Sequence, residues 1–229
     1  NRLLELTKPV ATAVVPISAG RHIYKREPSF PIAVACDPAF NFVYEANIRY
    51  LHHLGEVTYF SPLADTSLPD VGFVYLPGGY PELYLAALSA NRQMLQSIRR
   101  YVESGGKLLA ECGGMMYLCD EIRDKNGDVY PMAGVLHQSA TMENMKLRLG
   151  YRTLLYNETR LKGHEFHYSR LVEQQNPLPS CAVAYTAKGV ETDTPLYHYK
   201  NVWAGYTHLY WADPVGNEWF TKFVIDGNT

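Results

Sequence analysis

The stretch GGKLLAECGGMMYL, residues 105–118, places a cysteine between an apolar run and two glycines. The run KLLAE has the length and composition of a buried strand, and GGMMYL suits the start of a helix. A side chain at a sharp strand-to-helix turn is presented at the end of the strand, in the arrangement known as a nucleophile elbow. The stretch therefore predicts that Cys112 stands at such a turn, within a fold of alternating strands and helices.

Strand and helix signals also alternate on the N-terminal side of this stretch. Short apolar runs occur at PIAVACD (31–37), EVTYFSP (56–62) and FVYLPGG (73–79). Between them, VYEANIRYLHHLG (43–55) has a helical pattern that ends in glycine, and Asn91 is a good N-cap for a second helix that Gly105 ends. Strands that alternate with helices of this length predict an α/β fold with a mostly parallel sheet and helices on both faces.

Beyond about Tyr130 the pattern changes to runs rich in β-branched and aromatic residues. These runs are ATMENMKLRLGYRTLLYN (140–157), CAVAYTA (181–187) and PLYHYKNVWAGYTHLYW (195–211). Such composition favours strands. We expect them to be extra antiparallel strands along one edge of the same sheet.

Composition limits the classes of protein to which the chain can belong. Its 229 residues are 47% hydrophobic, with 21 basic and 23 acidic residues well mixed and a formal net charge of −2. This balance gives no basic surface for nucleic acid or an anionic membrane. No apolar run is long enough to cross a bilayer, and no secretory signal is present, so we expect a cytoplasmic protein. The four cysteines form no C-x-x-C pair and predict neither disulfides nor a zinc knuckle: Cys36, Cys112, Cys119 and Cys181.

The domain organisation follows from a Pro-bounded spacer, EPSFP, at residues 27–31. Residues 1–30 resemble a tail and linker, and residues 31–229 a single domain. The chain starts at Asn1 and is interpreted as cut from a longer one.

Two glycine-containing turns follow predicted strands and are candidates for one site, because the carboxyl ends of parallel strands meet at one edge of a sheet. In LPGGYPE (76–82), Gly78 and Gly79 let backbone amides approach a ligand and supply an oxyanion donor. The alternative is an ordinary turn before a helix. At the second turn, the helix N-terminus is expected to lower the pKa of Cys112, and Gly113 leaves room for substrate. The alternative there is an inert core cysteine.

A nucleophilic cysteine needs a base, and two histidine-containing motifs offer one. GHEFHYS (163–169) holds His164, Glu165 and His167, and AGYTHLYW (204–211) holds His208. The first motif lacks the H-E-x-x-H spacing of a zinc site, so it predicts a polar strand or loop that lines the pocket, and no metal. From the residues alone, His208 could equally be a packed edge-strand histidine. The other five histidines are expected to be solvated or to pack: His22, His52, His53, His137 and His198.

Six segments, in their order and approximate spacing, resemble the C-terminal glutaminase domain of the cobyrinate-type class I glutamine amidotransferases, which amidate corrinoids in cobalamin biosynthesis. They are CDPAFNFVYEANIRYL, FSPLADTSLPD, LPGGYPELY, AECGGMMYL, GHEFHYSRL and GYTHLYW. The resemblance covers the chain from Pro31 to about Trp211. It implies a flavodoxin-like sheet on which a cysteine and a histidine hydrolyse glutamine, and the ammonia serves ATP-dependent amidation of the a and c carboxylates of a corrinoid.

Residue by residue, the resemblance implies that Cys112 is the nucleophile and His208 the base, in preference to His164 or His167. Gly79 and Gly113 match the oxyanion donors. Many members of the wider class carry a glutamate two residues after the histidine, whereas position 210 is tyrosine here. No residue is therefore assigned to orient His208.

The resemblance also implies a partner, an N-terminal synthetase domain that is missing from this chain and that residues 1–30 would join. No G-x-x-x-x-G-K-[ST] motif occurs here, so ATP and magnesium are expected only in that domain, and no cofactor in this one. DPAFNF (37–42), with Phe40 and Asn41, is expected to line the pocket or face that domain, or to be a turn with buried aromatics. Glutamine is the expected substrate, and a homodimer is left open.

Three other functions remain compatible with these residues. A related glutaminase could serve a different acceptor, such as cobyric acid, a nickel tetrapyrrole or a cell-wall lipid precursor. The same sheet could carry a stand-alone cysteine hydrolase. The third alternative is a non-catalytic docking domain, which would have no need for a cysteine, a histidine and two glycine turns together.

Overall fold

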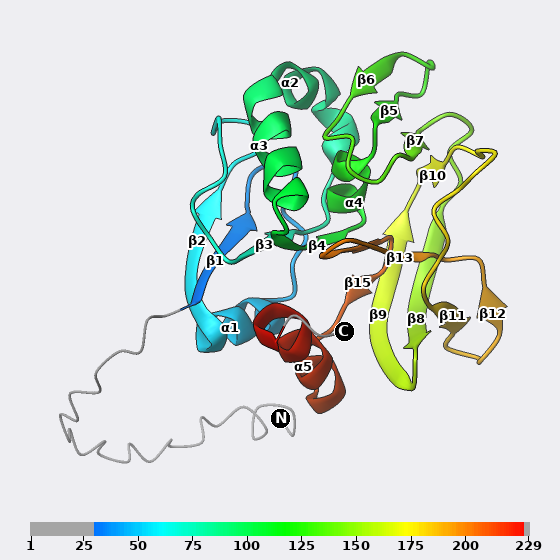
Figure 1. Cartoon of the computed structure of the whole chain (residues 1–229). Coiled ribbons are helices and arrows are strands. Elements are labelled where there is room, and N and C mark those ends of the chain that lie inside the picture. Colours follow the sequence, from blue (N-terminus) through cyan, green and yellow to red (C-terminus); the bar gives the residue numbers. More distant parts are fainter. Residues whose placement is uncertain (1–29, 227–229) are drawn as a thin grey trace, which may run out of the picture.

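A six-stranded sheet forms the centre of the computed structural model, which describes residues 30–226 (Figure 1). Its strand order is β13-β14-β4-β3-β1-β2. The strands are β1 (Phe30–Ala35), β2 (Gly55–Phe60), β3 (Phe73–Leu76), β4 (Lys107–Glu111), β13 (Leu196–Tyr199) and β14 (Val202–Gly205). All neighbouring strands are parallel except β13, which pairs antiparallel with β14 at one edge. The predicted mostly parallel sheet with an antiparallel edge strand is confirmed.

Helices cover both faces of this sheet, as the alternation of strand and helix signals predicts (Figure 1). One face packs against α2 (Leu85–Ala90), α3 (Arg92–Glu103) and α4 (Gly113–Leu118). The other face packs against α1 (Glu45–Leu54) and α5 (Pro214–Thr221). Consecutive residues of a strand point to opposite faces, so Leu108 belongs to the first core and Leu109 to the second.

The local start and stop signals predict two of these helices well. Gly55 ends α1, and its amide bonds to the Leu51 carbonyl. Asn91 caps α3 by accepting a hydrogen bond from the Met94 amide at 3.4 Å. A short 3₁₀-helix, Pro81–Leu83, follows the glycine turn after β3. Among the described residues, none of the helices has the length and apolar character that crossing a membrane requires.

The remaining strands form two further sheets instead of extending one edge of the central sheet. The first, β10-β7-β5-β6, contains β5 (Glu121–Arg123), β6 (Val129–Pro131), β7 (Ser139–Thr141) and β10 (Arg170–Leu171). The second, β12-β11-β8-β9-β15, contains β8 (Arg148–Tyr156), β9 (Thr159–His167), β11 (Val183–Thr186), β12 (Glu191–Thr192) and β15 (His208–Leu209). The β8–β9 hairpin pairs along nine residues of each strand, and its outer edges pair with β11 and β15, so this sheet forms without the central one.

The candidate base lies at the junction between two sheets. The chain leaves the central sheet at Gly205, the last residue of β14, and enters the hairpin sheet at His208, the first residue of β15. There His208 pairs with His164 on β9. The expected linker, residues 1–30, lies outside the described residues except for Phe30, and His22 lies outside them as well.

Replacing Phe220 with alanine is expected to lower the free energy of unfolding by about 3–5 kcal/mol, because it leaves a cavity in the second core. Phe220 lies on α5 with no exposed surface, stacked on Trp211 at 4.1 Å between ring centroids. Urea unfolding would measure the change. The control is Leu83→Ala, since Leu83 is 71% exposed and its loss should change stability by about 0.5 kcal/mol or less. Equal effects of the two substitutions would contradict the place of α5 in the core.

Candidate active site

Cys112 lies at the sharp turn between β4 and α4 that the sequence predicts. Its backbone has φ of 48° and ψ of −106°, in a region that residues other than glycine rarely adopt. Its amide donates a hydrogen bond to the Gly205 carbonyl at 2.8 Å, which ties the turn to the end of β14. Such backbone strain persists only where the surrounding structure holds it, and it is frequent at functional sites.

The glycine turn after β3 lies against the Cys112 turn. Gly79 has φ of 158°, and a Cβ atom there would lie 2.1 Å from the Ala39 carbonyl oxygen. A Cβ atom at Gly113 would lie 3.2 Å from the Gly79 amide nitrogen, so the two glycine backbones are neighbours. Pro81 also begins a 3₁₀-helix here, so the ordinary-turn interpretation and the ligand-binding interpretation of this motif are compatible.

Gly78 makes room for the imidazole of His208. A Cβ atom at position 78 would lie 2.1 Å from Cε1 and 2.9 Å from Nδ1 of that ring. The Gly78 carbonyl accepts a hydrogen bond from the Phe42 amide at 3.0 Å, and the Phe42 ring lies 4.3 Å from the His208 ring between centroids. The imidazole is therefore held between a bare backbone and an aromatic side chain.

Cys112 and His208 line one small cavity, which brings the predicted nucleophile and the predicted base together. Its volume is about 30 Å³, and its walls are Phe42, Gly79, Tyr80, Cys112, Phe166 and His208. A second cavity of about 20 Å³ also reaches Cys112, from the side of Met116 and His167. A water molecule takes about 30 Å³ in the liquid, so neither cavity holds an amino acid as it stands. Binding a substrate of that size requires the walls to move.

Burial dominates the acid–base properties of the pair. It raises the pKa of the Cys112 thiol to about 12, with a smaller contribution from the charge of Glu82, and the Gly113 amide opposes the rise. This reverses the expectation of a lowered pKa, because α4 has only six residues and the thiol is 5% exposed. Burial also lowers the pKa of His208 to about 3, helped by the charges of His164 and His167. His208 is therefore neutral at pH 7, which is the state that a base requires, although the same burial weakens it as a base.

The GHEFHYS motif covers the end of β9 and the two residues after it, and its side chains reach the cavities beside Cys112. Because side chains alternate along a strand, His164 and Glu165 point to opposite sides. His164 lies toward His208, with 6.4 Å between ring centroids. His167 lines the smaller cavity beside Cys112. His167 and Glu165 bind each other, with 2.8 Å between Nε2 and Oε1.

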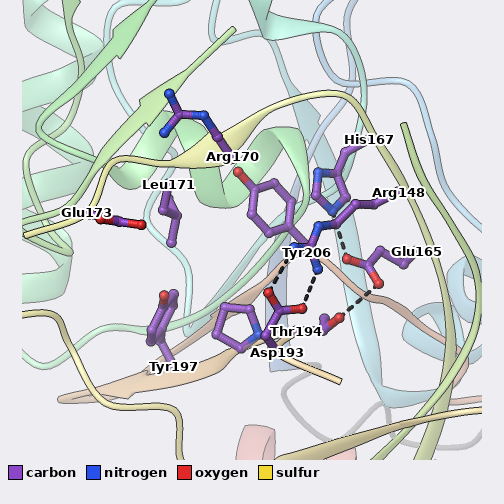
Figure 2. Close-up of a pocket in the computed structure, with 11 residues that line it drawn as sticks. Arg148, Glu165, His167, Arg170, Leu171, Glu173, Asp193, Thr194, Tyr197 and Tyr206 are labelled. Carbon is purple, nitrogen blue, oxygen red and sulfur yellow. Dashed lines mark hydrogen bonds and ion pairs between the residues drawn. The ribbon is translucent and has the colours of Figure 1, made fainter. Parts of the chain in front are cut away.

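Glu165 and His167 also line a wider pocket, of about 350 Å³ (Figure 2). Thr194 donates a hydrogen bond to Glu165 at 2.9 Å, and Arg148 forms an ion pair with Asp193 (Figure 2). These polar groups satisfy one another. Within residues 30–226, no three His, Cys, Asp or Glu side chains are grouped so that they could hold a metal ion.

Of the two phenylalanines in DPAFNF, Phe42 lines the site, whereas Phe40 lies in the core. Phe40 has no exposed surface and packs on Tyr117 in the core, at 5.2 Å between ring centroids, while Asn41 is exposed. Asp37 causes this turn, because its Oδ1 accepts hydrogen bonds from the amides of Ala39 and Phe40. An aspartate before proline favours a turn, and Phe40 fits the alternative that the sequence left open, a turn with buried aromatics.

Three comparisons place this geometry among known proteins. Residues 31–215 match the CobB/CobQ-like glutamine amidotransferase domain. The chain belongs to this family. Hydrogenobyrinate a,c-diamide synthase of Pseudomonas aeruginosa is 40% identical over 185 residues, which are 78% of this chain and 41% of that protein. Cobyrinate a,c-diamide synthase of Fusobacterium nucleatum is 40% identical over 188 residues, again 78% of this chain and 41% of that protein.

Solved structures agree with this assignment at the level of the fold. PurLQS from Thermotoga maritima gives a TM-score of 0.54 at 18% identity, over 79% of this chain and 87% of that one. A glutamine amidotransferase from the same organism gives 0.52 at 12% identity, over 87% and 84%. The flavodoxin-like α/β class expected for a CobB/CobQ-like glutamine amidotransferase domain is confirmed. The domain spans less than half the length of the two curated relatives.

Proposed function

We propose that this glutamine amidotransferase domain hydrolyses glutamine to glutamate and ammonia at Cys112 and His208. The ammonia would serve ATP-dependent amidation of the a and c carboxylates of a corrinoid, as in cobyrinic acid a,c-diamide synthase. The observation that carries the proposal is the convergence of a strained cysteine, a neutral histidine and the Gly79 backbone on one cavity. A core cysteine would need neither the strained turn nor the histidine.

The proposed chemistry begins with proton transfer from the Cys112 thiol to His208. The thiolate attacks the side-chain amide carbon of glutamine, and the amides of Gly79 and Gly113 stabilise the oxygen that becomes negative. The imidazolium then protonates the leaving nitrogen, and ammonia departs. A water molecule, deprotonated by His208, hydrolyses the glutamyl thioester and restores the thiol.

The acceptor and partner are proposed from the relatives. Both curated relatives named above are a,c-diamide synthases, and more than half of the length of each lies outside the match. We assign ATP, magnesium and the corrinoid to a synthetase domain of that kind, and no cofactor to the glutaminase domain. We place the reaction in the cytoplasm, where a catalytic thiol stays reduced.

Covalent labelling with the glutamine analogue diazo-oxo-norleucine tests the proposed function. We expect one adduct, on Cys112, that excess glutamine blocks and that peptide mass spectrometry maps. Cys36 is an internal control, because its side chain is exposed and would take up a reagent that reacts without a specific site. Labelling of Cys36 ahead of Cys112, or the absence of an adduct on Cys112, would contradict the assigned nucleophile.

A further inference from the structure

We propose that Glu111 is the positioning residue of the site and orients His208 through its Nδ1 atom. Glu111 is the last residue of β4 and directly precedes Cys112, so one short segment would position both reacting side chains. The inference rests on the proposed glutaminase function and deepens it. Many members of the wider class orient the histidine with a glutamate two residues after it. Here that position holds Tyr210, which is 38% exposed, and Glu111 supplies a carboxylate from another strand.

The carboxylate of Glu111 lies beside the Nδ1 atom of His208. Its Oε2 lies 4.0 Å from Nδ1, and both side chains are at least 96% buried. Nδ1 is buried and has no hydrogen-bond partner among residues 30–226. When one nitrogen of an imidazole exchanges a proton with a thiol, an acceptor at the other nitrogen fixes the ring and stabilises the imidazolium. Such contacts are often long before substrate binds and shorten in the complex.

The carboxylate is itself held in place by three donors. Tyr75 donates its hydroxyl proton to Oε2 at 2.7 Å, and Oε1 accepts from the Leu209 amide at 3.0 Å and the Trp211 indole at 3.4 Å. Leu209 directly follows His208 in β15. Glu111 therefore accepts a hydrogen bond from the backbone of this strand and also lies beside the imidazole of its first residue. A carboxylate oxygen accepts more than one hydrogen bond, which leaves Oε2 able to accept from His208.

The cost of burying Glu111 argues against a purely structural role. No arginine or lysine forms an ion pair with it among the described residues, and burial raises its pKa to about 7. A neutral side chain would fill the same place at lower cost. The other titratable groups that face the pair are Tyr44, Tyr75, Cys112, His164 and His167.

A double-mutant cycle on the rate of diazo-oxo-norleucine labelling at saturating reagent tests the inference. We expect Glu111→Gln to slow labelling of Cys112 by at least tenfold. In a His208→Ala background the same substitution should change the rate by less than twofold, because Glu111 acts through His208. Tyr101→Phe is the matched control, since it removes one partly buried hydrogen bond to the opposite end of β4, from Tyr101 to the Lys107 carbonyl.

The pH profile of the unaltered protein tests the same point without a substitution. The raised pKa of Glu111 means that it loses its charge below about pH 7. Labelling should therefore fall as the pH drops from 8 to 6, and the Glu111→Gln protein should show a flat profile over that range. Its melting temperature at pH 8 should be no lower than that of the unaltered protein, because a buried charge is removed.

Each other outcome overturns the inference. An equal loss in both backgrounds would give Glu111 a structural role only. Labelling of Glu111→Gln at the normal rate would end the inference and leave the glutaminase function standing. If the unaltered protein is not labelled at Cys112 in a way that glutamine blocks, the function fails and the inference fails with it.

Discussion

Replacement of Cys112 by alanine is expected to reduce glutamine hydrolysis by about 10⁴-fold or more, because the covalent intermediate can no longer form. Release of glutamate from glutamine, followed with a coupled assay, would measure the loss. The turn is tied by the amide of residue 112, which donates a hydrogen bond to the Gly205 carbonyl at 2.8 Å, and alanine keeps this bond. We expect the urea midpoint to change little.

Cys119→Ala is the matched control for this loss. Cys119 is buried like Cys112 and lies at the other end of α4, where its thiol donates to the Met115 carbonyl at 3.6 Å. Its replacement should keep the rate of glutamine hydrolysis within about twofold of normal. Hydrolysis that survives the loss of Cys112 but not that of Cys119 would reverse the assignment.

Replacement of His208 by alanine is expected to slow glutamine hydrolysis by about 10²–10⁴-fold, the usual contribution of a general base. The loss should also depend on pH. Without the imidazole, only thiolate formed by direct ionisation reacts, and the pKa of Cys112 is raised to about 12. The residual rate should then rise about tenfold for each pH unit between 7 and 10.

The control for this second prediction is His137→Ala, because His137 is exposed and pairs with Asp120 away from the site. Rates measured from pH 7 to 10 would separate the two variants. A residual rate that does not change with pH would show that another group takes the proton of Cys112, and His164 would be the next candidate because its ring neighbours that of His208.

The central sheet could be predicted from the sequence because its signals are local. Each strand is a short apolar run bounded by a turn, and Gly55 and Asn91 mark helix ends by their own chemistry. The two further sheets could not be predicted, because apolar strands of similar composition pair equally well with several partners. Tertiary contacts decide which strands pair: β8 pairs with β9, and β9 pairs on its other edge with β15.

The site divides in the same way. Cys112, Gly79 and Gly113 follow from turn chemistry, whereas the sequence alone does not separate His208 from His164, which became distinguishable only through a family resemblance. Glu111 has a signal in the sequence, because it is a charged residue directly after the apolar run Leu108–Ala110 of a buried strand. The pKa of Cys112 could not be predicted, because the groups that bury it, such as Phe166, come from a distant strand.

The small size of the two cavities beside Cys112 has a consequence for when the domain binds and hydrolyses glutamine. If the pocket is wide enough for glutamine only about one hundredth of the time, the apparent affinity for glutamine falls about one hundredfold. A synthetase domain that holds the pocket wide would restore that affinity without touching the nucleophile. Hydrolysis of glutamine would then be suppressed whenever that domain does not hold the pocket wide, and ammonia would form only when it does.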